Sequence, residues 1–296
     1  MIKQMRVDFY RVMNGSEPLH DLHLHLDRVY RRRSGLARNC EMGGDAFRLQ
    51  EYSSSGNRAT GDMLRIRMEN LPIKAGLDGT LDEFDLEDDE GIGEESAFLY
   101  DSSLAVLAYQ RNRTGVPVGR FAEYIERMAA IEGPITFEPV LEPSAMEKFT
   151  RMRRKTKVEL KCARADNPSF WPENDSVAQT IRNLSPLNAP YVNITASVGR
   201  QNGALDQSML AEIVRSVIGY RQRNRVTKME VSGRGAQDER LVVDLIEDRM
   251  VESVAMDVGR FRHAPYDSRA RHIEQAYGTR HSQLARLFRR VERGRP

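Results

Sequence analysis

The chain has 296 residues, of which 40% are apolar and 30% charged, and its mean hydropathy is −0.57. This composition excludes collagen, a disulfide-rich mini-protein and a wholly disordered chain, and no apolar run approaches the ~20 residues of a membrane-spanning helix. The formal net charge of +2 by itself indicates no nucleic-acid partner. Two cysteines and an N-terminus without an apolar signal core predict a cytoplasmic protein.

The first part of the chain predicts strands and helices in mixed order. Residues 5–13 alternate apolar and polar side chains, which predicts a strand, and residues 18–33 carry apolar side chains at helical spacing. Two more strands, at 47–52 and 63–68, are expected on either side of a polar loop that is long enough to be mobile. The acidic stretch after them predicts a loop or a short irregular helix, because its charges repel one another.

The rest of the chain keeps this mixed pattern. We expect strands at 97–100, 104–109, 135–141, 156–162 and 191–198, and helices at 118–130, from residue 143, at 177–184 and at 208–220. Three strands, at 226–231, 241–246 and 251–256, should form an antiparallel run before a closing helix over 268–291.

Hairpins with interspersed helices predict an α+β fold with mainly antiparallel sheets and two domains. The first domain would be residues 1–166, with the acidic segment 78–95, and the second residues 167–296, ending in a long basic helix.

The near-neutral net charge hides an uneven distribution. Residues 78–95 contain ten acidic side chains and no Lys or Arg, and without them the net charge of the chain is +12. Residues 148–164 contain eight basic side chains against one acid, and residues 260–296 contain ten Arg against three acids. Such clusters predict basic surfaces with one acidic counterweight, although a solvated charged face is the plain alternative for each.

Three basic clusters are our candidate contacts to nucleic-acid phosphates. On the strand TKVELKC the charged residues share one face and the apolar residues the other, while the closing helix carries Arg at helical spacing. The candidates are Arg151, Arg153, Arg154, Lys155, Lys157, Lys161, Arg221, Arg223, Arg225, Arg286, Arg289, Arg290 and Arg293. Phosphate contacts supply affinity without reading sequence, and the chain has no helix-turn-helix, zinc finger or aromatic RNA motif, so we expect weak sequence preference.

A second interpretation is a Mg²⁺-dependent nuclease. Glu159 and Lys161 on one strand fit the second half of a nuclease core, in which paired carboxylates bind Mg²⁺ and the lysine orients water. Glu138 or Glu142 could supply the carboxylate of the first half, but the usual Pro-Asp is absent.

Other catalytic and metal signals are weak. His20, His23 and His25 lie close together, yet on a helix His25 points away from the other two. Neither a phosphate-binding glycine loop nor a serine nucleophile elbow is present. The sequence therefore predicts no catalytic residue, no bound metal and no cofactor.

The order of segments in the middle of the chain carries a family resemblance. An acidic run with glycines (DDEGIGEES) precedes FLYDSSLAVLAYQRNRTGVPV, an amphipathic helix, ITFEPVLEP and TKVELK. Residues 88–163 in this order resemble the RexA family of prophage exclusion proteins, and more distantly the phage-defence family that includes KwaB. The shared positions are mostly structural: Phe98, Gly115, Phe137, Glu138, Pro139, Thr156 and Val158.

The resemblance implies a non-enzymatic protein that binds double-stranded DNA as a homodimer, senses phage DNA or replication complexes, and signals to a partner, typically a membrane protein. Charge adds the hypothesis that the acidic segment shields the DNA surface in a resting state. The remaining alternative is an interaction module that binds another protein through the acidic segment and contacts no nucleic acid.

Overall fold

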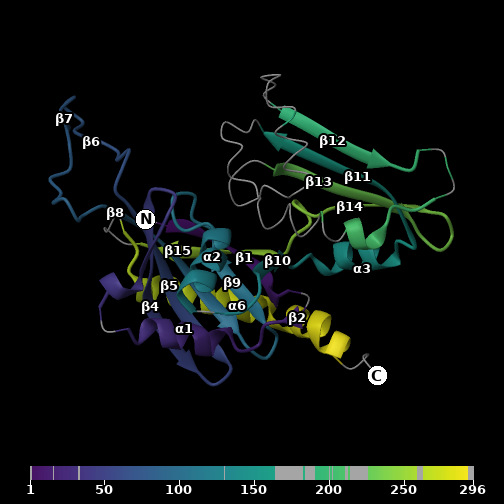
Figure 1. The fold of residues 1–296 in the computed structure, drawn as a ribbon, viewed down its shortest axis with the longest axis horizontal. Helices are drawn as coiled ribbons and strands as arrows, with labels where there is room; N and C mark the ends of the chain where they lie inside the picture. Colours follow the sequence, from purple (N-terminus) through teal and green to yellow (C-terminus); the bar gives the residue numbers. More distant parts are fainter. Residues whose placement is uncertain are drawn as a thin grey trace. The chain divides into compact units, whose positions relative to one another are not determined.

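The computed structural model describes residues 2–15, 17–32, 34–129, 131–163, 183, 191–199, 201, 203–210, 213, 226–258 and 263–292. Of residues 162, 163, 191, 226, 227 and 289–292 it describes the backbone alone. Helices are interspersed among runs of mainly antiparallel strands (Figure 1), so the predicted α+β class is confirmed.

The chain forms two compact units, and each is assembled from stretches that are distant in sequence. The first unit contains Met1–Val7, Val12–Ile135 and Glu252–Ser282, and the second contains Asp8–Arg11, Thr136–Val251 and Gln283–Pro296. Residues before and after 167 therefore contribute to both units. The expected boundary itself lies outside the described residues and stays a prediction.

The first unit is built on one antiparallel sheet. Its strands follow the order β1 (Ile2–Asn14), β9 (Val106–Gln110), β8 (Ile92–Asp101), β5 (Arg58–Arg67), β4 (Asp45–Ser55) and β3 (Asn39–Met42). The short β2 (Glu17–Pro18) and β15 (Val251–Asp257) also pair with β1. β8 and β9 are buried throughout most of their length because helices cover the sheet.

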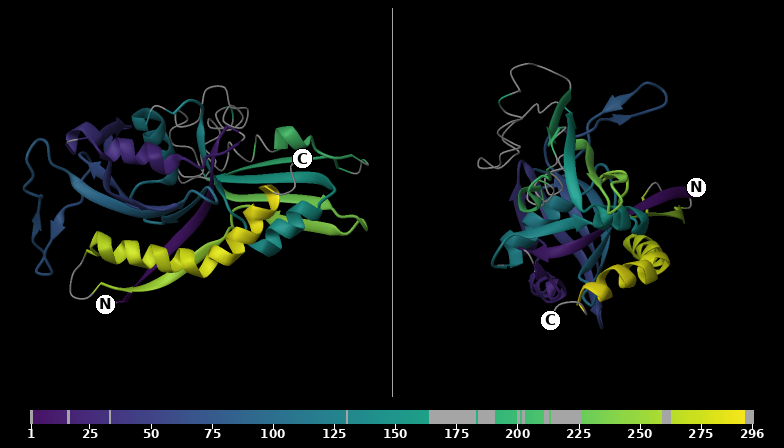
Figure 2. Two further views of the ribbon diagram at one scale, coloured as in Figure 1. Left: turned by 90° about the horizontal axis from the view of Figure 1, so that it is seen from below. Right: turned by 90° about the vertical axis from the view of Figure 1, so that its right-hand side faces the viewer.

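Helices lie on both faces of this sheet (Figure 2). α1 (Leu22–Tyr30) packs against β4 and against α2 (Val118–Ala129), and the 3₁₀ turn η1 (Leu36–Arg38) leads into β3. α6 (Tyr266–Glu292) runs along the opposite face, and its buried side Ile273, Ala276 and Tyr277 recurs at helical spacing. No helix in the described part of the chain has the length and apolar character needed to cross a bilayer.

The prediction of a long polar loop between β4 and β5 is wrong. The two strands continue through the polar residues to a two-residue turn at Gly56 and Asn57, where Ser55 pairs with Arg58. Gly56 adopts a φ of 57°, which a tight hairpin turn requires and which glycine tolerates without cost. Serine and threonine thus continue the ladder as strand residues, so composition alone was misleading here.

The acidic stretch, expected as a loop or a short irregular helix, contains one strand of a small projecting hairpin and otherwise lacks regular structure up to the start of β8. β6 (Lys74–Ala75) pairs with β7 (Leu81–Asp82), and the flanking residues have no regular structure (Figure 1). We call residues 68–90 the arm. Five of its large apolar side chains are exposed: Met68, Ile73, Leu77, Leu81 and Phe84.

The second unit holds a four-stranded antiparallel sheet with one helix packed on it. The strand order is β12 (Tyr191–Ser197), β11 (Arg154–Ala163), β13 (Val226–Arg234) and β14 (Arg240–Asp244), and α3 (Pro143–Arg151) contacts β14. Val158, Leu160, Met229 and Val231 form the core of this unit. β10 (Ile135–Pro139) pairs with β1, whose residues Asp8–Arg11 belong to this unit.

The antiparallel run expected at the end of the chain is partly wrong. β13 and β14 pair as predicted, but β15 pairs with β1 of the first unit. Turn residues after β14 take the chain out of the sheet, and Met250 donates its backbone N–H to Val140 O. The expected helix 177–184 and most of the helix 208–220 lie outside the described residues.

Candidate functional site

The predicted basic strand β11 has the two faces that its sequence indicates. Val158 and Leu160 are buried in the core of the second unit, while Lys157, Glu159 and Lys161 lie on the other face. The strand register adds further charged residues to this face, because directly paired residues project on the same side of a sheet. Those on its strands are Arg154, Lys157, Glu159, Lys161, Lys228, Glu230, Arg234, Arg240 and Asp244.

The basic charge concentrates at one end of this face. Arg154 of β11 pairs with Arg234 of β13, and Arg234 pairs with Arg240 of β14. We call these three residues the arginine row. Neighbouring strands lie ~4.8 Å apart, so the three side chains stand next to one another across ~10 Å.

The hairpin that joins β13 to β14 offsets part of this charge. Asp238 Oδ1 lies 2.7 Å from Arg154 Nη2, and Arg234 Nη1 donates to the backbone oxygen of Asp238 at 2.9 Å. Glu239 accepts a hydrogen bond from Arg151 at 3.3 Å. Within the described part of the chain, Arg153 and Arg240 form no ion pair and are exposed. The end of the sheet therefore keeps an excess of guanidinium groups.

The middle of the same face is electrically balanced. Glu159 lies 2.5 Å from Lys157 Nζ and 3.3 Å from Lys228 Nζ, and Lys228 also contacts Glu230 at 2.8 Å. Hydrogen bonds from Lys157 and Lys228 lower the pKa of Glu159, and hydrogen bonding to Glu230 raises the pKa of Lys228. We call this cluster the lysine–glutamate ladder. Neighbouring carboxylates neutralise much of the positive charge of Lys157 and Lys228.

The nuclease interpretation finds its second carboxylate at an unexpected position. β12 and β13 flank β11, so Glu138 on β10 and Glu142, which precedes α3, do not lie on neighbouring strands. Glu230 instead stands directly opposite Glu159. Lys228 bridges the two carboxylates, so a Mg²⁺ ion would have to displace an ammonium group. Among the described residues, no group of three His, Cys, Asp or Glu is placed to hold a metal.

The other predicted phosphate contacts are scattered or lie outside the described part. Lys155 follows the arginine row but projects to the opposite face, where its Nζ packs over the ring of Phe149. Arg286 lies on α6 and is already engaged in a contact. The side chains of Arg221, Arg223, Arg225, Arg289, Arg290 and Arg293 are outside the described residues.

The three clustered histidines have separate partners. His20 Nδ1 donates a hydrogen bond to the backbone oxygen of Ser102, His23 stacks on Tyr100, and His25 lies 3.5 Å from Asp21. They do not converge on a common point.

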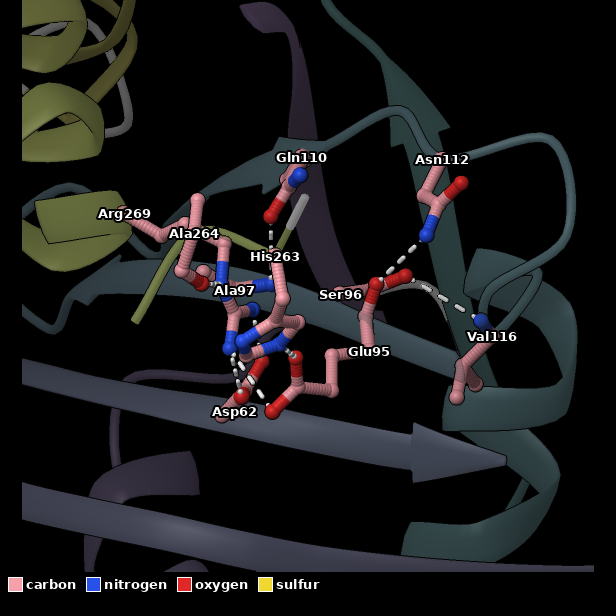
Figure 3. A network of polar contacts seen from close by, with 10 residues as sticks. All are labelled: Asp62, Glu95, Ser96, Ala97, Gln110, Asn112, Val116, His263, Ala264 and Arg269. Carbon is pink, nitrogen blue, oxygen red and sulfur yellow. Dashed lines mark hydrogen bonds and ion pairs between the residues drawn. The ribbon is translucent and has the colours of Figure 1, made fainter. Parts of the chain in front are cut away.

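The first unit contains a polar cleft that the sequence did not indicate. Its volume is about 340 Å³, and its walls come from the starts of β1 and β8, the ends of β9 and β15, the loop after β9, and residues before and at the start of α6. Below the cleft, Arg269 forms two parallel hydrogen bonds to Asp62, at 2.7 and 2.6 Å (Figure 3). Both side chains are almost completely buried.

Glu95 extends this ion pair towards solvent. Its Oε1 lies 2.9 Å from Arg269 Nη2, and its Oε2 contacts His263 Nε2 (Figure 3). Burial raises the pKa of Asp62 to about 6, although Arg269 opposes this shift. Burial would lower the pKa of Arg269, but hydrogen bonding and the charge of Asp62 outweigh it and raise that pKa. The two parallel hydrogen bonds have the geometry of a charged carboxylate–guanidinium pair.

A loop fixes the backbone of Glu95 from the other side. Asn112 Nδ2 donates to Glu95 O at 2.9 Å, and Val116 N donates to Ser96 Oγ at 3.1 Å. A Cβ on Gly115 would stand 2.4 Å from Ser96 Oγ and 2.7 Å from Glu95 O, so only glycine fits. The resemblance pointed to Gly115 as a structural position, and this close approach explains it.

The comparisons with known proteins give a family and no activity. A search of curated proteins finds no match to this chain. Residues 1–285 match the model of a family of unknown function, DUF6731, and because the match covers nearly the whole chain, the protein belongs to that family.

Proposed function

We propose that this protein binds double-stranded DNA through its phosphates, with little sequence preference, at the arginine end of the second unit. The arginine row supports the proposal most directly. Like charges placed directly opposite one another destabilise a sheet, and Asp238 offsets only part of the repulsion between Arg154, Arg234 and Arg240. A row of phosphates would supply the missing negative charge, and guanidinium groups bind phosphate with two parallel hydrogen bonds.

The centre of the proposed interface lies at the arginine row and not at the predicted lysines of β11. Lys157 and Lys161 lie beside the ladder carboxylates, so they would contribute less than Arg153, Arg234 and Arg240. The sequence carries no helix-turn-helix, zinc finger or aromatic RNA motif, which is why we expect phosphate contacts alone.

The biological setting of the proposal rests on the resemblance to the RexA family. In that setting the protein acts in the cytoplasm as a homodimeric sensor in phage exclusion, without an enzymatic activity of its own, and signals to a membrane-protein effector. The arm could shield the basic end, since its acidic charge complements the arginines.

The test measures binding of the full chain to two labelled duplexes of unrelated sequence, from low to physiological salt. We expect equal affinity for both duplexes and a steep fall with salt. The variant Arg234→Gln/Arg240→Gln should bind at least tenfold more weakly, and its salt slope should drop by about one per lost phosphate contact. The matched control Arg31→Gln/Arg127→Gln removes two exposed arginines of the first unit and should bind as wild type.

The same assay separates the alternatives. Equal binding by the row variant and its control would overturn the proposal, and no binding at low salt would favour a protein-interaction module. DNA fragments that appear only with Mg²⁺ and vanish in Glu159→Gln would favour the nuclease, whose specific support is the Glu159–Glu230 pair. Replacing the acids of the arm with Ser should raise DNA affinity if the arm shields the surface.

A further inference from the structure

The strand β12 forms an edge of the four-stranded sheet without the usual protection of an edge (Figure 1). Among the described strands its partner is β11 alone. Its seven residues, YVNITAS, include no charged residue and no proline, whereas the opposite edge strand β14 begins with Arg240 and ends with Asp244. Charged residues and proline are the means by which edge strands avoid pairing with other chains. The sequence of β12 therefore permits a further strand to pair with it.

The hydrogen bonds to β11 determine which backbone groups of β12 point outwards. Val198 N donates to Thr156 O at 3.0 Å, and the register of the two strands continues from there without a bulge. In an antiparallel ladder every second residue makes the bonds to the neighbouring strand. The even-numbered residues of β12 therefore bond to β11. The N–H and C=O groups of the residues between them point away from β11, and these residues are Asn193, Thr195 and Ser197.

The apolar side of the sheet is incompletely covered at this edge. Val192, Ile194 and Ala196 project to the side of the core, where Ile194 pairs with Leu160 of β11. Leu160 is 2% exposed, but Val192 and Ile194 are only half-buried and Ala196 is exposed. The alternate residues of β12 are polar and uncharged, and they lie on the charged side of the sheet. A further strand at this edge would remove apolar surface from water, which stabilises association.

We propose that the free edge of β12 pairs with the same edge of a second copy of this chain, which joins two four-stranded sheets into one. Antiparallel pairing centred on Ile194 sets Asn193 of one copy opposite Thr195 of the other, so the outward backbone groups bond to one another. It also sets Val192 opposite Ala196, so that apolar residues meet on the core side. A single two-fold axis generates all these contacts, as in most homodimers. A foreign strand would have to match this alternation, whereas a second copy has it already.

The joined sheet would carry both arginine rows on one face. The two-fold axis stands perpendicular to the sheet, so the charged faces of the two copies lie on the same side. Arg154 precedes Leu160, the residue opposite Ile194, by six positions, which corresponds to ~20 Å along the strand. The rows of the two copies therefore lie ~40 Å apart, and at ~3.4 Å per base pair a duplex needs ~12 base pairs to reach both. This consequence rests on the proposed DNA binding, whereas the paired edge does not.

The main experiment measures the mass of the full chain by sedimentation equilibrium at increasing protein concentration. We expect twice the 33.8 kDa of one chain. Thr195→Pro removes an outward N–H and leaves the bonds to β11 intact, because proline is tolerated where the N–H faces away from the neighbouring strand. It should be monomeric, and so should Thr195→Lys, which puts a charge on the edge. The matched control Thr195→Val keeps a β-branched residue and should stay dimeric. Unfolding curves check that the three variants fold.

Cysteine cross-linking tests the register. In the double variant Asn193→Cys/Thr195→Cys, the new cysteines of the two copies have Cα atoms ~5.5 Å apart, a distance that a disulfide can span. Mild oxidation should link this variant into covalent dimers. Each single variant should link at least about tenfold more slowly, because identical positions lie diagonally at ~7–8 Å. Equal linking of the double and single variants would contradict pairing centred on Ile194.

DNA length tests the joined face. The wild type should bind a duplex of about 20 base pairs at least tenfold more tightly than one of about 10, since only the longer duplex reaches both rows. In Thr195→Pro this preference should shrink to the few-fold effect of the additional sites on longer DNA. The variant Arg234→Gln/Arg240→Gln should keep the dimeric mass and lose affinity for both duplexes.

Two outcomes would overturn the paired edge: a monomeric mass at every concentration, and a dimer that persists in both Thr195→Pro and Thr195→Lys. Neither result would affect the proposed DNA binding if both duplexes still bind. An unchanged length preference in Thr195→Pro would overturn the joined face. Conversely, a dimer that depends on Thr195 but binds neither duplex would overturn the proposed function and leave the interface intact, so the two proposals fail separately.

Discussion

The two units use charged side chains in opposite ways. In the first unit Asp62 and Arg269 are buried, bidentate and surrounded by protein. In the second unit the lysine–glutamate ladder and the arginine row lie on a half-exposed sheet face. A buried ion pair stays in one geometry, because separating the partners would leave an unpaired charge in the protein interior. An exposed ion pair contributes little to stability and separates easily. Exposed cations can therefore exchange an internal partner for a phosphate, and buried ones cannot.

The largest effect should follow from breaking the buried pair. Arg269→Met leaves Asp62 and Glu95 without their shared cation, and we expect a loss of about 3–5 kcal/mol in the free energy of unfolding at pH 7. Because burial already raises the pKa of Asp62 to about 6, the folded variant can take up protons as the pH falls. The loss should therefore shrink below pH 6, as measured by urea unfolding across pH. Equal losses at pH 5 and pH 8 would contradict this electrostatic explanation.

Asp101→Asn should have the next largest effect, on the same unit but over a more acidic pH range. Burial alone would raise the pKa of Asp101, but hydrogen bonds from Ser103, Tyr277 and Leu104 outweigh it and lower the pKa below 3.8. The ionised form therefore stabilises the fold above pH 3.8, and this contribution disappears as the pH falls through the lowered pKa. We expect the free energy of unfolding of the variant to be lower by about 2 kcal/mol at pH 7. Below pH 4 its stability should fall less steeply with pH than that of the wild type. Tyr277→Phe keeps the carboxylate, so its stability should fall at acidic pH nearly as steeply as that of the wild type.

Breaking the ladder should have a small effect. Lys228→Met removes the ammonium group shared by Glu159 and Glu230, which are both partly exposed. We expect only a slight decrease of the unfolding midpoint at low salt, and none at high salt, because exposed ion pairs are screened. A large, salt-independent loss would show that the ladder behaves like the buried pair and would remove the contrast between the two units.

The arm should contribute least to stability. Leu77 is fully exposed, so Leu77→Ser should leave the unfolding midpoint unchanged in thermal scans. The buried comparison is Leu99→Ala in β8, which should cost about 2–5 kcal/mol. If Leu77→Ser destabilised the protein, the arm would be packed against something in solution.

Local patterns predicted most of the elements. The alternation in β11 located its buried and charged faces, and the helical spacing in 118–130 and 268–291 matched α2 and α6 within a few residues. The β4–β5 turn was misjudged because a hairpin rich in serine has the composition of a loop. The partner of β15 was misjudged because adjacency in sequence favoured β14.

The cleft could not have been found from one sequence. Asp62 and Arg269 are separated by 207 positions, and neither belongs to a motif. The arginine row depends on register, since Arg234 and Arg240 flank a turn and Arg154 starts a strand 80 residues earlier. The clustering of basic residues in the sequence indicates only the stretch around Arg154. These contacts arise only when the chain folds, and no short stretch of the sequence indicates them.

The discontinuous assembly of the units has a consequence during synthesis on the ribosome. β1 is made first but pairs with β15, which is made about 240 residues later. At translation rates of 5–20 residues per second, that strand waits roughly 10–50 s for its partner. An unpaired strand edge is prone to pair with other chains meanwhile. Fragments cut near the middle of the chain would keep that edge open permanently, so we expect them to aggregate, and the intact chain to require chaperones for efficient production.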